Sequence, residues 1–380
     1  MSAQAPERLE AGPTRSRGWR GLRRVVRGLG VGLATAVVLL GVSLVTASGW
    51  QPPEPRPPLD VEPLPVVAPW DRHLPYAFVD RVDLVTESGR AARLVRPRGA
   101  RGTIPGAVLV AGAGRTTRDD LAEEAEALAR GGVAVLTYDK TDEGYGALRR
   151  DYAGLAADAL LALRTLARQP GVDPGRLGLV GWSEGGWVAP LAAAQDPGLV
   201  AFTVLVSAPM VSPLEQASWV VDRRLRVVPG PLRAGAAALL VTGRSFAPGL
   251  DTDVRPELAA TERRTYAVWG AEDTSVPVRT AVGRFVEATR GRAVVEVVPG
   301  AGHRVPVATG WVERVSDWVR RGYPTDDRVR GVQPADLAGL PTLPRPGWPP
   351  PPVGLAAAVL VGIGAGAWRG PGSVRSARSG

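Results

Sequence analysis

One serine of this chain stands between glycines in a setting that suits nucleophilic chemistry. The motif Gly-Trp-Ser-Glu-Gly occupies positions 181–185, after the apolar stretch 176–180 and before the Ala-rich stretch 186–194. A strand that turns sharply into a helix exposes the hydroxyl at the turn, and glycines relieve the crowding there. The pattern therefore predicts Ser183 as a catalytic nucleophile.

A serine hydroxyl needs a base to accept its proton, and histidine is the side chain suited to this task near neutral pH. The chain has two histidines. His73 lies among prolines ahead of the first expected strand, where a solvated linker residue is the more common finding. His303 lies in a loop directly after the last expected strand, where a base is needed. We therefore predict His303 as the general base.

The third partner of such a site is a carboxylate on the loop after the preceding strand. That loop, residues 270–277, offers Glu272 and Asp273. Asp273 is our prediction because it lies one position further round the turn and so is better placed to reach His303, with Glu272 as the alternative. The chain order serine, aspartate, histidine is that of α/β hydrolases and differs from the orders in chymotrypsin and subtilisin.

An oxyanion that forms on the substrate needs two backbone N–H donors. We expect one from Glu184, directly after the serine, and one from Ala113, in the glycine-rich loop 110–114 that follows the first parallel strand. Serine at the turn excludes the chemistries that use aspartate or cysteine there. The sequence contains no phosphate-binding loop and no clustered metal ligands, so we expect neither a cofactor nor a metal.

Short β-branched runs alternate with Ala/Leu-rich stretches over residues 76–323, as in a mostly parallel sheet with helices on both faces. We predict eight strands, at 78–86, 92–96, 106–110, 133–137, 177–180, 202–206, 265–269 and 294–298. Helices are expected at 119–130, 152–168, 185–194, 278–289 and 310–320. Residues 208–263 interrupt the alternation and predict a small cap insertion. The fold class is therefore α/β, of the α/β-hydrolase type.

The segments outside this domain point to a membrane. Residues 28–50 are uncharged and mostly apolar, long enough to cross a bilayer, and the preceding arginines favour a cytoplasmic N-terminus. A cleaved signal peptide is the alternative. We expect the domain outside the cytoplasm, at the cell membrane, or secreted after cleavage. The other segments are a basic N-terminus (1–27), two Pro-rich linkers (51–75 and 324–352), a second apolar stretch that either spans or forms a disordered or interfacial tail (353–368), and a basic tail (369–380).

The net charge of +9 sits at the two ends. Seven arginines against two glutamates in residues 1–27, and three arginines in residues 369–380, account for +8 of it. The centre is nearly neutral, which argues against nucleic-acid binding. Because the chain has no cysteine, disulfides and thiolate zinc sites are excluded.

Several runs resemble a bacterial branch of α/β-hydrolase serine carboxylesterases that have a Gly-x-Ser-Glu-Gly-Gly turn. They are Val-Leu-Val-Ala-Gly-Ala-Gly at 108–114 with Arg-Asp-Asp at 118–120, Ala-Val-Leu-Thr-Tyr-Asp-Lys at 134–140, and Trp-Ser-Glu-Gly-Gly at 182–186 with Ala-Pro at 189–190. The likeness covers roughly residues 105–305. Family members usually have histidine in place of Trp182 and arginine in place of Thr141. The resemblance implies hydrolysis of small, short-chain esters without a cofactor.

The leading functional prediction is ester hydrolysis through an acyl-enzyme, with a small ester as substrate and the membrane as the other partner. Three alternatives stay open: amide or peptide cleavage, acyl transfer to an acceptor other than water, and a catalytically silent membrane-anchored module. The same triad serves the first two. A broken triad would indicate the third.

Overall fold

The computed structural model describes the central part of the chain. Its residues are 59–64, 74–140, 145–146, 150–225, 227, 249–260, 264–290, 292–325 and 328–334. The apolar segments 28–50 and 353–368, both charged ends and His73 lie outside these ranges, so the predictions about them stay predictions. Within these ranges, no helix combines the length and the apolar character that crossing a membrane requires.

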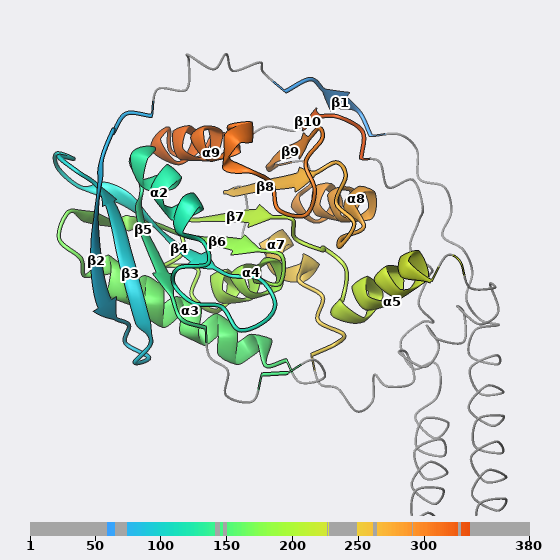
Figure 1. Ribbon diagram of the computed structural model, residues 1–380, viewed down its shortest axis with the longest axis horizontal. Helices are drawn as coiled ribbons and strands as arrows, with labels where there is room; N and C mark the ends of the chain where they lie inside the picture. The colour runs from blue at the N-terminus through green and yellow to red at the C-terminus, as the bar shows by residue number, and fades with distance from the viewer. Residues whose placement is uncertain are drawn as a thin grey trace, which may run out of the picture.

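Ten strands form one sheet, in the order β1-β10-β9-β8-β7-β6-β4-β5-β3-β2 (Figure 1). Among the described strands, only β3 runs opposite to the others, because it pairs antiparallel with both β2 and β5. The strands are β1 (Val61–Glu62), β2 (Val79–Val85), β3 (Ala91–Pro97), β4 (Ile104–Val110), β5 (Ala134–Tyr138), β6 (Val172–Trp182), β7 (Phe202–Val206), β8 (Thr265–Gly270), β9 (Val294–Val298) and β10 (Val329–Gly331).

The eight predicted strands are all present, and two short ones were missed. β1 and β10 pair in parallel at one edge of the sheet, with Val61 opposite Val329. Both lie in the stretches expected to be Pro-rich linkers, residues 51–75 and 324–352. A strand of two or three residues is too short to show an alternating pattern, and proline is tolerated beside the edge strand β1 because one side of its backbone needs no partner.

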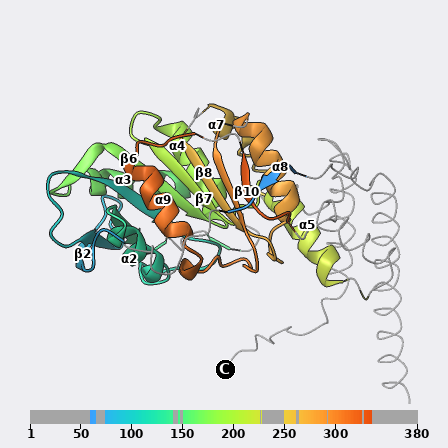
Figure 2. The ribbon, with the colours of Figure 1, turned by 90° about the horizontal axis from the view of Figure 1, so that it is seen from above.

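Helices cover both faces of the sheet (Figures 1 and 2). The buried residues of α2 (Ala122–Arg130) and α9 (Trp311–Arg320) pack in one core cluster. Those of α3 (Tyr152–Ala167), α4 (Gly185–Gln195), α7 (Arg255–Ala260) and α8 (Val278–Thr289) pack in the other. Alternate residues of β4 enter the two clusters, since successive side chains of a strand point to opposite faces.

Without β1 and β10, the strands of the sheet follow one another in the chain order 1-2-4-3-5-6-7-8. An antiparallel pair occupies one edge, and the turn that carries Ser183 follows the fifth of these strands. This is the α/β-hydrolase fold, as predicted.

Residues 208–263 are expected to form a cap, but one described part of them packs against the main body of the domain. α7 packs against α4 and α8 and so covers the sheet. α5 (Pro213–Arg224) begins with a capping box between Ser212 and Glu215. Arg284 of α8 holds the Glu215 carboxylate with two hydrogen bonds of 2.8 Å, so α5 is fixed to α8 at the rim of the domain. Residues 228–248 lie outside the described ranges, and the cap itself stays a prediction.

Candidate active site

Ser183 stands at a strained turn between β6 and α4. Its φ of 51° is left-handed, a conformation that costs a residue with a side chain about 1 kcal/mol or more. Two glycines make the turn sterically feasible. A Cβ at Gly181 would lie 2.2 Å from the carbonyl oxygen of Gly185, and one at Gly185 would lie 2.2 Å from that of Val110. The glycines of the motif are therefore required by close backbone contacts.

The structure brings the three residues predicted for the triad together. His303 Nε2 lies 3.0 Å from Ser183 Oγ, and His303 Nδ1 lies 2.7 Å from Asp273 Oδ2. The three residues come from loops after three different strands, β6, β8 and β9. Parallel strands deliver all of these loops to the same edge of the sheet, which is where ligands of open α/β sheets bind.

The Asp273 side chain is fully buried and its second oxygen is already held. Asp273 Oδ1 accepts the backbone N–H groups of Ser275 at 2.7 Å and Val276 at 3.1 Å. Oδ2 is thereby directed at the imidazole. Glu272, the alternative, is exposed to solvent, and it is Asp273 that contacts His303.

The backbone around His303 is fixed by two contacts that the sequence did not reveal. Ser207, directly after β7, is fully buried and has a φ of 49°. Its hydroxyl donates to the carbonyl oxygen of His303 at 2.7 Å. Close packing of the loops also requires Gly270, where a Cβ would lie 2.2 Å from the carbonyl oxygen of Gly302. A serine at a strand end carries no periodic or motif signal, so Ser207 could not be identified from sequence.

The loop after β4 lies against the nucleophile turn. A Cβ built on Gly112 would lie 3.4 Å from the Cβ of Ser183. Within the part of the chain that the structure describes, the backbone N–H groups of Ala113 and Glu184 donate no hydrogen bond. Among the described residues, no protein acceptor therefore competes for these two groups.

The two side chains on either side of Ser183 are both buried. Trp182 is buried and packs edge-on against Trp311 of α9, with ring centroids 5.8 Å apart, so it serves the core. The sequence predicts a role for the backbone N–H group of Glu184 only. Its carboxylate is also buried, and it accepts hydrogen bonds from Lys140, Tyr145 and Arg150.

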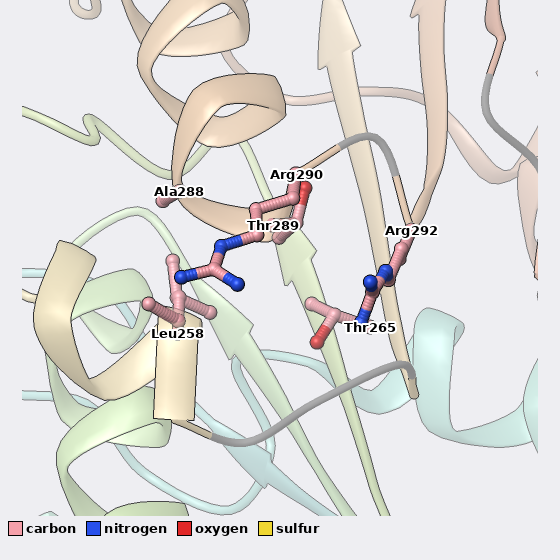
Figure 3. Close-up of a pocket in the computed structure, with 7 residues that line it drawn as sticks. Leu258, Thr265, Ala288, Thr289, Arg290 and Arg292 are labelled. Carbon is pink, nitrogen blue, oxygen red and sulfur yellow. The ribbon is translucent and has the colours of Figure 1, made fainter.

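A separate small pocket lies away from these residues (Figure 3). Thr265, Thr289, Arg290 and Arg292 line it, together with parts of α7 and α8. Because Thr265 begins β8 and Asp273 follows its end, this pocket belongs to the opposite edge of the sheet. Among the described residues, no three His, Asp or Glu side chains are grouped so that they could hold a metal ion.

No family model matches the chain, but two relatives show which family it belongs to. The uncharacterized proteins Rv2307c and MT2364 of two Mycobacterium tuberculosis strains are each 30% identical over 231 residues, which cover 59% of this chain and 73% of each relative. The chain belongs to the family of Rv2307c. Both relatives are named as uncharacterized proteins, so their names indicate no activity for this chain.

Solved structures with low identity are also similar to the chain. The Pyrococcus furiosus esterase Pf2001 is 19% identical, with a TM-score of 0.46 over 70% of this chain and 99% of that one. The α/β hydrolase GrgF from Penicillium is 20% identical, with a TM-score of 0.46 over 65% of this chain and 99% of that one.

Proposed function

We propose that this protein is a serine hydrolase that cleaves small carboxylic esters through an acyl-enzyme. One observation carries the proposal: Ser183 Oγ, His303 and Asp273 form a continuous hydrogen-bonded chain with distances of 3.0 and 2.7 Å. A hydroxyl within reach of an imidazole, itself oriented by a buried carboxylate, is the arrangement that activates serine.

In the first half of the reaction Ser183 Oγ attacks the ester carbonyl carbon while His303 Nε2 accepts its proton. The carbonyl oxygen becomes an oxyanion, for which the N–H groups of Ala113 and Glu184 are the proposed donors. When the tetrahedral intermediate collapses, the bond to the alcohol breaks, and His303 returns the proton to the leaving oxygen. The acyl group remains on Ser183.

In the second half water replaces the alcohol. His303 Nε2 takes a proton from water as it attacks the acyl carbon, and the same two N–H groups receive the new oxyanion. Collapse releases the carboxylic acid and restores the Ser183 hydroxyl. Throughout, Asp273 accepts the Nδ1–H of His303, which leaves Nε2 facing the serine and stabilises the protonated ring. The proposed cycle needs no cofactor.

The choice of esters rests on the resemblance across residues 105–305, since the same triad serves amides, peptides and acyl transfer. A panel of p-nitrophenyl esters with acyl chains of increasing length, run beside aminoacyl anilides, tests this choice. We expect turnover of the short esters. Faster cleavage of the anilides would identify a peptidase or amidase instead.

Fluorophosphonate labelling tests the hydrolase proposal directly, because the probe phosphonylates only an activated serine. We expect labelling of the wild-type protein, none of Ser183→Ala, and abolished turnover in His303→Gln. Thermal unfolding of each variant provides the control for folding. Folded wild-type protein that stays unlabelled would contradict the proposal and favour the catalytically silent module.

We also propose that the domain is held outside the cytoplasm by residues 28–50. The supporting feature is the uncharged apolar run that follows seven arginines. Mass spectrometry of the membrane fraction should recover peptides from residues 1–27. A mature protein that begins near Ser48 would instead indicate a cleaved signal peptide and secretion.

A further inference from the structure

The carboxylate of Glu184, next to the proposed nucleophile, accepts hydrogen bonds from three side chains. Only 2% of the residue is exposed. Lys140 Nζ and Tyr145 Oη donate to Oε2, the latter at 2.6 Å, and Arg150 Nη1 donates to Oε1 at 2.7 Å. A buried carboxylate with two cations and a hydroxyl has its charge and its lone pairs well satisfied.

Two of these donors also hold the loop that contains Ala113. Lys140 Nζ donates to the carbonyl oxygen of Gly112 at 2.9 Å. Tyr145 Oη accepts the N–H of Gly114, also at 2.9 Å. The two contacts lie on either side of Ala113, one on the residue before it and one on the residue after it. The two side chains that make these contacts, Lys140 and Tyr145, both donate to the same oxygen of Glu184, Oε2.

Two cations lie against the ring of Tyr145 and fix its orientation. Lys140 Nζ lies 4.3 Å from the centre of the ring, and the guanidinium carbon of Arg150 lies 4.4 Å from it. Such contacts contribute on the order of 1 kcal/mol each. Arg150 also donates to the hydroxyl, so the group that accepts the Gly114 N–H has little freedom to move.

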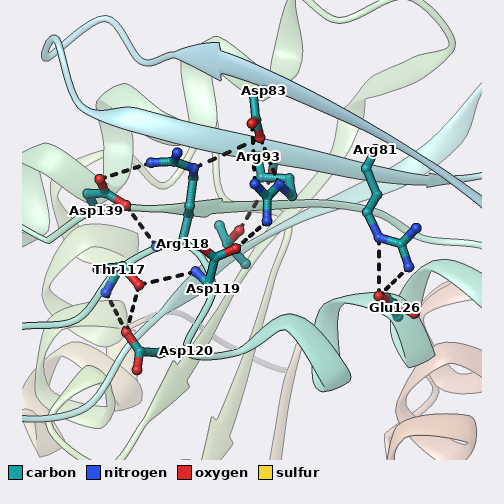
Figure 4. A network of polar contacts seen from close by, with 10 residues as sticks. Arg81, Asp83, Arg93, Thr117, Arg118, Asp119, Asp120, Glu126 and Asp139 are labelled. Atoms are coloured by element: carbon teal, nitrogen blue, oxygen red, sulfur yellow. Dashed lines mark hydrogen bonds and ion pairs between the residues drawn. The ribbon is translucent and has the colours of Figure 1, made fainter.

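The outer side of the same loop is held by the residue next to Lys140 (Figure 4). Asp139 accepts the backbone N–H of Arg118 at 2.8 Å and its guanidinium at 3.1 Å. The backbone N–H of Lys140 donates to Thr116 at 3.0 Å. Consecutive residues after β5 therefore hold the loop after β4 from two sides.

We propose that Lys140, Tyr145 and Glu184 act as positioning residues that join the two oxyanion donors into one rigid unit. The carboxylate that receives Lys140 and Tyr145 belongs to the residue whose own N–H is the first donor. The second donor, the Ala113 N–H, lies between the two backbone atoms that Lys140 and Tyr145 hold. This inference rests on the proposed function.

Rigidity at this place has a large effect on rate. Donors aimed at a developing charge stabilise it only when they are already in position, and a displacement of about 1 Å can cost on the order of 100-fold in rate. Loss of one link should therefore affect the transition state more than substrate binding.

The test compares Tyr145→Phe with a matched control, Tyr266→Phe. Tyr145→Phe removes only the hydroxyl and keeps the ring on which both cations rest. Tyr266 Oη donates to another buried carboxylate, Glu296, at 2.5 Å, within the sheet and away from the triad. Rates are expressed per serine that the fluorophosphonate labels, so a loss of folded protein does not count as a loss of rate.

For Tyr145→Phe we expect kcat to fall about 10- to 100-fold while KM stays within about threefold of the wild-type value. The inhibition constant of a trifluoromethyl ketone, which forms an oxyanion on Ser183, should rise by the same factor as kcat falls. Tyr266→Phe should leave both constants unchanged. If Tyr145→Phe does not fold, Lys140→Met is measured in its place with the same expectation.

Wild-type kcat and ketone affinity in the folded variant would overturn the inference, as would equal losses in both tyrosine variants. Either result leaves the proposed function intact, because that proposal depends on labelling of Ser183. Absence of labelling in the wild-type protein would remove the proposed function itself.

Discussion

Glu184 and Glu296 are both buried carboxylates, each hydrogen-bonded to a tyrosine hydroxyl and an arginine. Glu296 is fully buried in β9, and Arg314 of α9 donates to both of its oxygens, at 2.8 and 3.0 Å. The partners of Glu296 join two strands to a helix in the body of the domain. Those of Glu184 lead to backbone atoms of a loop that faces Ser183. Burial and pairing are therefore alike in the two clusters, which differ in the atoms that the partners of each carboxylate contact.

The two clusters should thus respond alike in stability and differently in activity. Removing one partner of a buried ion pair leaves an uncompensated charge in either place. Only at Glu184 does the change also loosen the proposed oxyanion donors.

The largest effect on rate is expected for Glu184→Gln. The amide keeps the shape and the backbone N–H, but it leaves Lys140 and Arg150 without their negative partner and disturbs the contacts on both sides of Ala113. We expect kcat per labelled serine to fall on the order of 100-fold in a steady-state ester assay. A folded variant with kcat within about twofold of wild type would make the two clusters equivalent.

Glu296→Gln should affect stability and spare the rate. Loss of the charge that Arg314 faces should lower the free energy of unfolding by about 3 kcal/mol, measured by urea denaturation. We expect kcat per labelled serine to stay at the wild-type value. A fall in kcat as large as that of Glu184→Gln would show that rate follows general stability.

The Glu184 cluster contains a lysine, Lys140, whereas the cation of the Glu296 cluster is an arginine, Arg314. Because of this difference, a smaller effect on kcat is expected in alkaline solution. Burial lowers the pKa of Lys140 below its ordinary 10.5, although the Glu184 carboxylate opposes this shift. Burial alone would lower the pKa of Arg314, but the hydrogen bond to Glu296, the charge of Glu296 and the contacts with Tyr266 together raise it. The Glu184 cluster therefore loses a positive charge at a pH at which the Glu296 cluster keeps its own.

As pH rises through the lowered pKa of Lys140, the folded state releases this proton before the unfolded state does. Between that pKa and 10.5 the contribution of Lys140 to the free energy of unfolding rises with pH. The hold on Gly112 weakens in the same window, so kcat should decline while the domain stays folded. In Lys140→Arg, which remains charged, the normalised decline should begin at higher pH. Coincident pH profiles of the two proteins would contradict this account.

The fold and the grouping of Ser183, Asp273 and His303 could be predicted because their signals are local. Each buried strand contains a short, mostly apolar run that includes valine, and Ser183 lies between two glycines that the turn requires. Only two histidines exist, and one of them directly follows a strand. The choice of Asp273 over Glu272 needed only the direction of one turn.

The Glu184 cluster could not be predicted because its members are far apart in sequence. Glu184 is separated from Lys140 by 44 positions and from Arg150 by 34, and neither interval follows a helical or strand period. Lys140 belongs to the resembling run 134–140, but that run does not indicate which residue it contacts. Which carboxylate it pairs with depends on how β5 lies beside β4 in the sheet.

Because β1 pairs with β10, the two ends of the described domain lie side by side. Val61 lies opposite Val329 and Glu62 opposite Arg330, and an ion pair between Glu62 and Arg328 reinforces this seam. The first and last described residues therefore leave from the same corner of the domain. A circular permutant that joins residue 334 to residue 59 through a short glycine-rich connector should keep all ten strands. Any tether attached at either end would pull on the β1 edge of the sheet and leave the β2 edge free.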